Sequence, residues 1–172
     1  NICAGEHDRS PVFYQSKGVV QLSNFDFKVR KIREDDKAEF MAMSRDFYSS
    51  DAVLYPVPDS YHESAFNEVM RSDVYADCRI FTIGEKVVGY ALLLKSYARE
   101  AGGVCIWTDE LYIKPEYRGC GIGTRFFAWL EENLPAARYR LEAEPENEGA
   151  VRLYHRMGYK ELPYMQLVKE KQ

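Results

Sequence analysis

The residues best placed for chemistry in this sequence lie in a glycine-rich stretch between a strand-like run ending at Ile113 and a helix-like run ending at Leu134. Glycine lets the backbone approach a ligand without a Cβ in the way, and the amides of a helix's first turn have no partner inside the helix. Such amides suit a pyrophosphate, and an arginine adds a positive charge with fork geometry. The stretch, here called the glycine loop, therefore predicts an anion-binding site. Its residues are Arg118, Gly119, Cys120, Gly121, Ile122, Gly123 and Thr124.

The spacing of the glycine loop excludes two familiar phosphate motifs. A P-loop needs a Gly-Lys pair directly before Ser or Thr, but the residue directly before Thr124 is Gly123. A dinucleotide fingerprint needs GxGxxG, but its third glycine would fall on Thr124 or Phe126. What remains is Arg-x-x-Gly-x-Gly between a strand and a helix. A tight turn without a ligand is the alternative interpretation, which the arginine and the flanking elements disfavour.

The pattern of Arg118, Gly121 and Gly123 resembles the acyl-CoA pyrophosphate loop of the GNAT N-acetyltransferase superfamily. Residues 111–119, LYIKPEYRG, resemble the strand and proline turn that lead into that loop. Residues 147–159 resemble a later helix of the family, with Asn147 at its start and Gly158 at its end. The two motifs occur in the family's order, and close agreement covers about residues 104–159.

The resemblance implies acetyl transfer from acetyl-CoA, as cosubstrate, to an amine by direct attack within a ternary complex. In this family backbone groups of the strand before the loop, here Leu111, Tyr112 and Ile113, hold the CoA. Asn147 matches the position that contacts the pantetheine arm, and it is also a good helix N-cap. No metal set is expected, since the histidines and cysteines are scattered.

Tyr154 matches the family's usual general acid. A phenol with a pKa near about 10 stays protonated at neutral pH and can donate to a thiolate whose reference pKa is about 8.5. Without the resemblance, Tyr154 would be read as part of an apolar helical stripe with Ala150, Leu153 and Met157. The resemblance reverses that preference.

Three carboxylates are candidates for the base that removes the amine proton. Asp109 and Glu110 are neighbours on one strand, so their side chains point to opposite faces. Glu142 matches the position of the base in the superfamily's protein N-terminal acetyltransferases. Asp109 matches the position of a glutamate that the superfamily's polyamine acetyltransferases place before this strand. We rank Glu110 and Asp109 above Glu142, and a solvated acid at a strand end is the alternative for each.

The acceptor site should be built by the first half of the chain, as in the family. Residues 51–77 carry six acids against Arg71 alone, and such a field attracts a cation. Tyr55, Tyr61 and His62 could line a pocket for an ammonium group. An ordinary acidic helix surface is the alternative. The sequence therefore predicts a small cationic amine as acceptor.

The composition excludes several other classes of protein. The 172 residues suit one domain, and 46% hydrophobic residues exclude a disordered chain. A net charge of −4 gives no overall positive charge to attract the phosphate backbone of a nucleic acid. No apolar run reaches the length of a membrane span. Four dispersed cysteines and the lack of a signal-peptide core favour a reduced, cytoplasmic setting.

Hydrophobic periodicity predicts an α/β fold: a mixed, mostly antiparallel central sheet with helices on both faces and a parallel βαβ unit at the glycine loop. Residues 1–26 are expected to be an N-terminal extension of unknown role, with a candidate strand at 19–22, and residues 27–172 a single domain. The expected strands are 27–32, 78–83, 87–94, 104–113, 138–144 and 159–169, and the expected helices are 34–50, 60–72, 121–134 and 147–157.

A second function remains open from the sequence. A domain of this fold could bind acyl-CoA as a sensor or interaction module without turnover. Tyr154 and the strand acids favour the enzyme, because a sensor needs no proton donor at the sulfur. A homodimer is an expectation from the resemblance alone, and the identity of the amine stays open.

Overall fold

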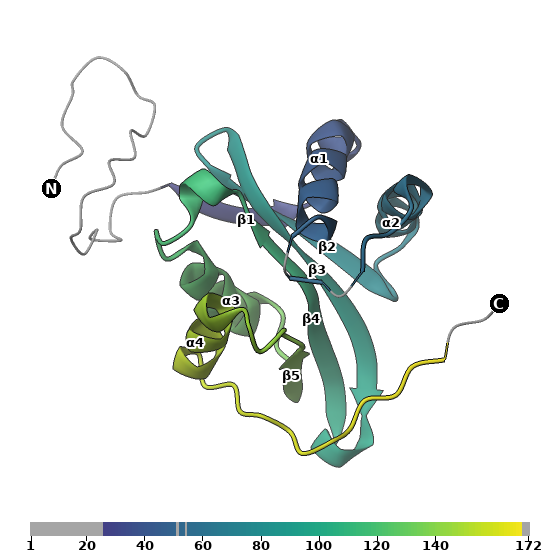
Figure 1. Cartoon of the computed structure of the whole chain (residues 1–172), viewed down its shortest axis with the longest axis vertical. Helices are drawn as coiled ribbons and strands as arrows, with labels where there is room; N and C mark the ends of the chain where they lie inside the picture. Colours follow the sequence, from purple (N-terminus) through teal and green to yellow (C-terminus); the bar gives the residue numbers. More distant parts are fainter. Residues whose placement is uncertain (1–25, 51, 54, 170–172) are drawn as a thin grey trace, which may run out of the picture.

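The computed structural model describes residues 26–50, 52–53 and 55–169. In this part of the chain one five-stranded sheet, in the order β1-β2-β3-β4-β5, carries four α-helices (Figure 1). The predicted α/β fold is confirmed. The elements are β1 (Phe27–Lys31), η2 (Glu34–Asp36), α1 (Lys37–Tyr48), α2 (Asp59–Arg71), β2 (Ala76–Ile83), β3 (Lys86–Ala98), η3 (Arg99–Ala101), β4 (Gly103–Ile113), η4 (Pro115–Tyr117), α3 (Ile122–Asn133), β5 (Arg138–Leu141) and α4 (Glu148–Arg156).

Strands β1 to β4 form an antiparallel meander, and β5 pairs parallel with β4 after the crossover through α3. The β4–β5 ladder runs from the pair Cys105–Arg138 to the pair Thr108–Leu141. Strand β4 continues to Ile113, so its last five residues lie beyond that ladder. Among the described residues no other strand pairs with this edge of β4, which leaves its backbone groups free for a ligand.

A β-bulge interrupts the pairing of β3 with β4. Leu92 pairs with Glu110, but the next residue, Leu93, pairs with Thr108. Asp109 is therefore the extra residue on β4. Because the extra residue breaks the strict alternation of side chains along β4, Asp109 and Glu110 are no longer bound to point to opposite faces of the sheet, and the charge of Asp109 acts on Glu110.

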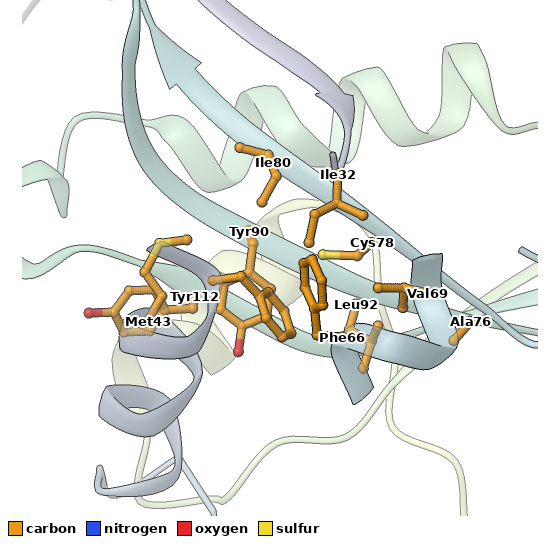
Figure 2. Packing of buried hydrophobic residues seen from close by; sticks show 11 residues of the cluster. Ile32, Met43, Phe66, Val69, Ala76, Cys78, Ile80, Tyr90, Leu92 and Tyr112 are labelled. Atoms are coloured by element: carbon orange, nitrogen blue, oxygen red, sulfur yellow. The ribbon is translucent and has the colours of Figure 1, made fainter. Parts of the chain in front are cut away.

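Two apolar clusters fill the two faces of the sheet. Helices α1 and α2 cover the first cluster, part of which Figure 2 shows. In this cluster the Phe40 ring on α1 contacts both the Phe66 ring on α2 and the Tyr90 ring on β3. Helix α3 covers the second cluster through Phe126 and Phe127, and α4 packs beside it. Helices on both faces were predicted, and the alternation of apolar residues along β2 and β3 explains how one sheet serves both clusters.

The expected strand at residues 159–169 is wrong. These residues are not paired with the sheet and are largely exposed, including Met165 at 85% and Leu167 at 88%. Pro163 has no N–H to donate to a ladder, which disfavours pairing at the start of this segment. Alternation of apolar residues is therefore present here without a partner strand.

The predicted extension at residues 1–26 lies outside the described residues except for Asp26, and so does the candidate strand at 19–22. The boundary of a single domain at residue 27 stays a prediction. None of the helices in the described ranges has the length and apolar character needed to cross a membrane.

Candidate active site

The glycine loop joins β4 to α3 as predicted. Gly119 and Gly121 have φ angles of 75° and 77°, in the left-handed region where a side chain is strained. A Cβ at Gly119 would meet no atom within 4 Å, so the space beside this residue is open. Gly121 is the N-cap residue of α3, whose first amides point toward the loop. This local backbone geometry is compatible with an anion at the loop, and the binding of one stays a prediction.

Gly123 has a second, structural role. A Cβ at this position would lie 2.6 Å from Leu153 Cδ2, closer than real Cβ contacts allow. A side chain at residue 123 would therefore require the end of the Leu153 side chain on α4 to move. Leu153 thus packs directly on the first turn of α3, next in sequence to Tyr154.

Arg118 is held at the end of β4. Its Nε donates a hydrogen bond to the Ile113 carbonyl oxygen at 2.8 Å, and its guanidinium lies 5.8 Å from the centre of the Tyr112 ring. The residue remains exposed. Its terminal amino groups can therefore serve an anion bound on the loop, while the Nε contact orients the side chain.

Cys120 is not an activated thiol. Loss of hydration raises the pKa of its thiol above the ordinary value. Its Sγ lies 3.7 Å from the Arg118 carbonyl oxygen. A contribution of Cys120 to ligand binding would therefore come from its backbone, as the resemblance implies. The three cysteines in the described part of the chain, Cys78, Cys105 and Cys120, are free thiols.

Glu110 lies in the core, on the sheet face that α1 and α2 cover. Only 5% of the residue is exposed. The Tyr90 hydroxyl donates to Glu110 Oε2 at 2.5 Å, and the Tyr48 hydroxyl donates to Oε1 at 2.9 Å. Burial raises the pKa of Glu110, and the two hydrogen bonds partly oppose this rise.

Asp109 is more exposed than Glu110 and lines a cavity with Glu142, which directly follows β5. The two carboxylates line a cavity of about 370 Å³ together with Trp107 and Lys95. Loss of hydration is the main cause that raises the pKa of Asp109, and the charge of Glu142 adds to it. Arg140 stacks on Trp107, with 4.0 Å between guanidinium and ring centre. Asp109 and Glu142 therefore form an acidic pair at the end of the β4–β5 ladder.

Tyr154 lies on α4, half-buried against α3. Its ring meets that of Phe127 edge to face, with 5.7 Å between centres. Desolvation raises the pKa of its hydroxyl to about 12, so Tyr154 is fully protonated at neutral pH. Tyr154 and Glu142 line one cavity of about 870 Å³ between β5, α4 and the segment after α4. Glu142 thus lines both this cavity and the smaller one beside Asp109.

Asn147 is the N-cap of α4, as predicted. Its side-chain Oδ1 accepts a hydrogen bond from the Ala150 amide at 3.2 Å. The amide nitrogen of the same side chain is left for other partners, so the cap is compatible with a ligand contact. Among the described residues no group of three potential metal ligands is found.

The acidic window at residues 51–77 does not form an isolated negative surface. Five of its six acids pair with cations, and the sixth, Asp51, lies outside the described residues. Counting charges in one window overlooked the cations of neighbouring elements. The pairs are Asp59–Arg45, Glu63–Lys37, Glu68–Arg71, Asp73–Lys31 and Asp77–Arg79, with Lys95 also near Asp77.

The expected pocket of Tyr55, Tyr61 and His62 is also wrong. Tyr55 and Tyr61 are 76% and 61% exposed, whereas His62 is 4% exposed and hydrogen-bonded to Ser44. Neighbours on a helix point about 100° apart, and here Tyr61 projects to solvent while His62 projects into the core. Tyr48 and Tyr90, the partners of Glu110, were missed because only the folded sheet and α1 bring them to this carboxylate.

Fold and site together define an α/β acyltransferase domain. The family model described as "Acetyltransferase (GNAT) family" matches residues 37–159, and the chain belongs to this family. The domain is therefore a GNAT-type acyltransferase, an enzyme class that acetylates amines.

Proteins that are similar to this chain in sequence or in structure include acetyltransferases, in agreement with this family. The chain is 28% identical over 151 residues to the mouse thialysine N-epsilon-acetyltransferase, covering 78% of this chain and 85% of the relative. A possible acetyltransferase from Clostridium difficile 630 is similar in structure, with a TM-score of 0.72, 18% identity and coverage of 84% and 97% of the two chains. Aminoglycoside N-acetyltransferase AAC(6')-Iy, solved with CoA, gives a TM-score of 0.70 at 13% identity, with coverage of 86% and 97%.

Proposed function

We propose that this enzyme transfers the acetyl group of acetyl-CoA to the primary amine of a small cationic acceptor, by direct attack in a ternary complex. The observation that carries this proposal is the Asp109–Glu142 pair beside the free edge of β4. Two facing carboxylates repel each other, and an ammonium group between them would relieve that repulsion. The thialysine acetyltransferases and the aminoglycoside acetyltransferase have names that specify amino-bearing substrates, which supports this class.

The acyl donor would lie along β4 and end on the glycine loop. Backbone groups of Leu111, Tyr112 and Ile113 lie on the edge beyond the β4–β5 ladder, where an extended ligand can hydrogen-bond. The amides of residues 119–124 and the guanidinium of Arg118 would hold the pyrophosphate. Asn147, at the start of α4, would contact the pantetheine arm. An amide near Ile113 would stabilise the negative charge on the carbonyl oxygen during attack.

The proton chemistry divides between two sides of the sheet. On the α3–α4 side, Tyr154 would protonate the departing thiolate, because its hydroxyl keeps its proton at neutral pH. On the α1–α2 side, Glu110 would accept the proton of the amine, directly, through water or through the Tyr48 hydroxyl. Asp109 and Glu142 would bind the acceptor's positive charge. The three acids predicted from the sequence thus receive two different roles.

A non-catalytic acyl-CoA sensor is the other candidate function. The sensor needs the glycine loop but has no use for a buried carboxylate bonded to two phenols or for a protonated tyrosine beside the loop. These features favour the enzyme.

Two amines of similar size test the acceptor class, one cationic at pH 7 and one neutral. We expect a lysine-like alkyl amine to have a kcat/KM about tenfold or more above that of a neutral aromatic amine. Asp109→Asn should reduce this preference. Equal kcat/KM values for the two amines would contradict the cationic acceptor while leaving acetyl transfer itself intact.

A further inference from the structure

Arg140 on β5 lies over the ring of Trp107 on β4, close to the acidic pair. Arg140 and Trp107 are partners in the β4–β5 ladder, and 4.0 Å separates the guanidinium from the centre of the ring. Trp107 also pairs with Leu94, which packs against the cluster that α1 and α2 cover. Since paired residues of neighbouring strands point to the same face, Arg140 and Trp107 lie on the face of the sheet that also carries Glu110.

The guanidinium of Arg140 has no carboxylate partner in the part of the chain that the structure describes. Arg138, two residues earlier on the same strand, forms an ion pair with Glu100 at 3.4 Å. The tryptophan ring occupies one face of the Arg140 guanidinium, whereas the five N–H groups point outward in its plane. An aromatic ring therefore orients Arg140, and its N–H groups are available to a ligand.

Arg140 lies where the two cavities of the site adjoin. Arg140 lines the larger cavity, and the Trp107 ring in contact with it lines the smaller one. Glu142 lines both. Lys95 also lines the smaller cavity, but its ammonium lies 3.6 Å from the buried carboxylate of Asp77. The site thus presents one cation without an acidic partner beside the two carboxylates of the acidic pair.

The order of these groups along β4 gives an acceptor a direction. Counted back from the glycine loop, the strand presents Glu110, then Asp109, and then Trp107 with Arg140 stacked on it. Two residues separate Trp107 from Asp109, which corresponds to about 6–7 Å along a strand. An α-amino group shares its carbon with the carboxylate and is closer to it than this spacing. The spacing therefore suits an amine that several bonds separate from a carboxylate.

We propose that Arg140, held on Trp107, binds a carboxylate of the acceptor, which is therefore an amino acid whose reacting amine ends its side chain. The inference rests on the proposed function, in which the acidic pair receives the acceptor's ammonium group. A guanidinium binds a carboxylate through two parallel N–H···O bonds, and stacking on a ring leaves this edge accessible. A polyamine has no carboxylate, and its second ammonium group would meet the positive charge of Arg140.

Three amines that share one chain and differ at its far end test the carboxylate site. Pentylamine ends in a methyl group, 6-aminohexanoate in a carboxylate, and cadaverine in a second ammonium group. We expect a kcat/KM for 6-aminohexanoate that is about tenfold or more above those for the other two. In Arg140→Met, which keeps an apolar side chain over Trp107, the ratio of 6-aminohexanoate to pentylamine should fall to about one.

Arg138→Met is the matched control, because Arg138 is a cation of the same strand that already has an acidic partner. Its ratio of 6-aminohexanoate to pentylamine should stay close to that of wild type. Equal kcat/KM values for these two amines in wild type would overturn the carboxylate site and leave acetyl transfer to amines intact. An equal loss of preference in Arg138→Met and Arg140→Met would also overturn the site, because the total charge of β5 would then explain the preference.

Binding at Arg140 can also be measured without turnover, by NMR of the indole N–H groups in the full chain with CoA present. The sequence has two tryptophans, and loss of one signal in Trp107→Phe assigns Trp107. 6-Aminohexanoate should shift the Trp107 signal saturably in wild type and much less in Arg140→Met. No shift in wild type would overturn the carboxylate site. A saturable shift without acetylation of any of the three amines would instead refute the proposed function and retain the site.

Discussion

Asp109 and Glu142 face each other at the point where the β4–β5 ladder ends. The last pair of that ladder is Thr108–Leu141, so each acid is the next residue of its own segment. The bulge on β4 leaves Asp109 without a partner on β3 and frees it to turn toward Glu142. Lys95 also lines their cavity, but its ammonium contacts Asp77 at 3.6 Å and the Asp73 carbonyl at 2.9 Å. The pair is therefore suited to a cation supplied from outside.

Replacing Asp109 should affect acceptor binding more than turnover. Asp109→Asn removes one charge of the pair, so we expect the KM for a cationic amine to rise about tenfold with a smaller change in kcat. Glu142→Gln should give a change in the same direction. Initial rates over a range of amine concentrations measure both constants. If both Asp109→Asn and Glu142→Gln leave the KM for the amine unchanged, the acidic pair does not bind the acceptor.

Tyr154→Phe should slow turnover about tenfold or more, because the departing thiolate loses its proton donor. The affinity for acetyl-CoA should not change. Tyr159→Phe is a matched control, since Tyr159 also contacts Phe127 and lines the same cavity. Thiol-release rates and calorimetric titration with acetyl-CoA give the two quantities. An unchanged rate in Tyr154→Phe would remove this hydroxyl from the mechanism.

Arg118→Ala should weaken CoA binding. A charged hydrogen bond contributes about 1.5–3 kcal/mol, so the expected loss of affinity is on the order of tenfold to a hundredfold. Arg152→Ala, on the exposed side of α4 where Arg152 pairs with Glu148, should bind CoA like the wild type. Both dissociation constants can be measured with CoA by calorimetry. Equal affinity of Arg118→Ala and wild type would refute the pyrophosphate role.

The ionisation of Glu110 should lower the free energy of unfolding as pH rises. Burial raises the pKa of Glu110 in the folded chain above the ordinary value of about 4.3, so the folded state binds more protons than the unfolded state in this interval. The contribution of Glu110 to the free energy of unfolding is thus fully present below about pH 4.3 and is lost as pH rises through the raised pKa. The free energy of unfolding of wild type should therefore fall over this interval compared with that of Glu110→Gln. The decrease is at most about 1.4 kcal/mol for each pH unit within that interval. Urea unfolding from about pH 4 to about pH 8 measures this difference.

Exposed Glu132 supplies the control for that titration. Glu132→Gln removes a carboxylate on the solvent side of α3, so its unfolding free energies should run parallel to those of wild type. Parallel curves for Glu110→Gln and wild type would contradict a raised pKa at residue 110.

Local patterns predicted much of the fold and the glycine loop. The positions of Gly119 and Gly121, the N-cap Asn147 and the hairpin turn at Gly84 follow from the conformations that these residue types favour. The strand at residues 159–169 was wrong because alternation shows which faces are apolar but not whether a partner strand is present.

The partners of the candidate catalytic acids could not be predicted in this way. Tyr48 and Glu110 are 62 residues apart in sequence, and the contact of Tyr90 with Glu110 depends on the register set by the bulge at Asp109. The charge of the acidic window was misjudged for the same reason, because Lys31 and Lys37 reach it from other elements. Side chains that act together across the fold are set by tertiary register, which a local pattern does not carry.

The most direct test of the central claim is release of CoA thiol from acetyl-CoA by the full chain, with mass spectrometry of the acceptor. The panel should hold thialysine, polyamines, amino acids, aminoglycosides and short peptides, each corrected for the rate without acceptor. The account predicts strong release with a cationic small amine and a product heavier by one acetyl group. Tight binding of acetyl-CoA with no release for any acceptor would contradict acetyl transfer to these amines and favour the sensor.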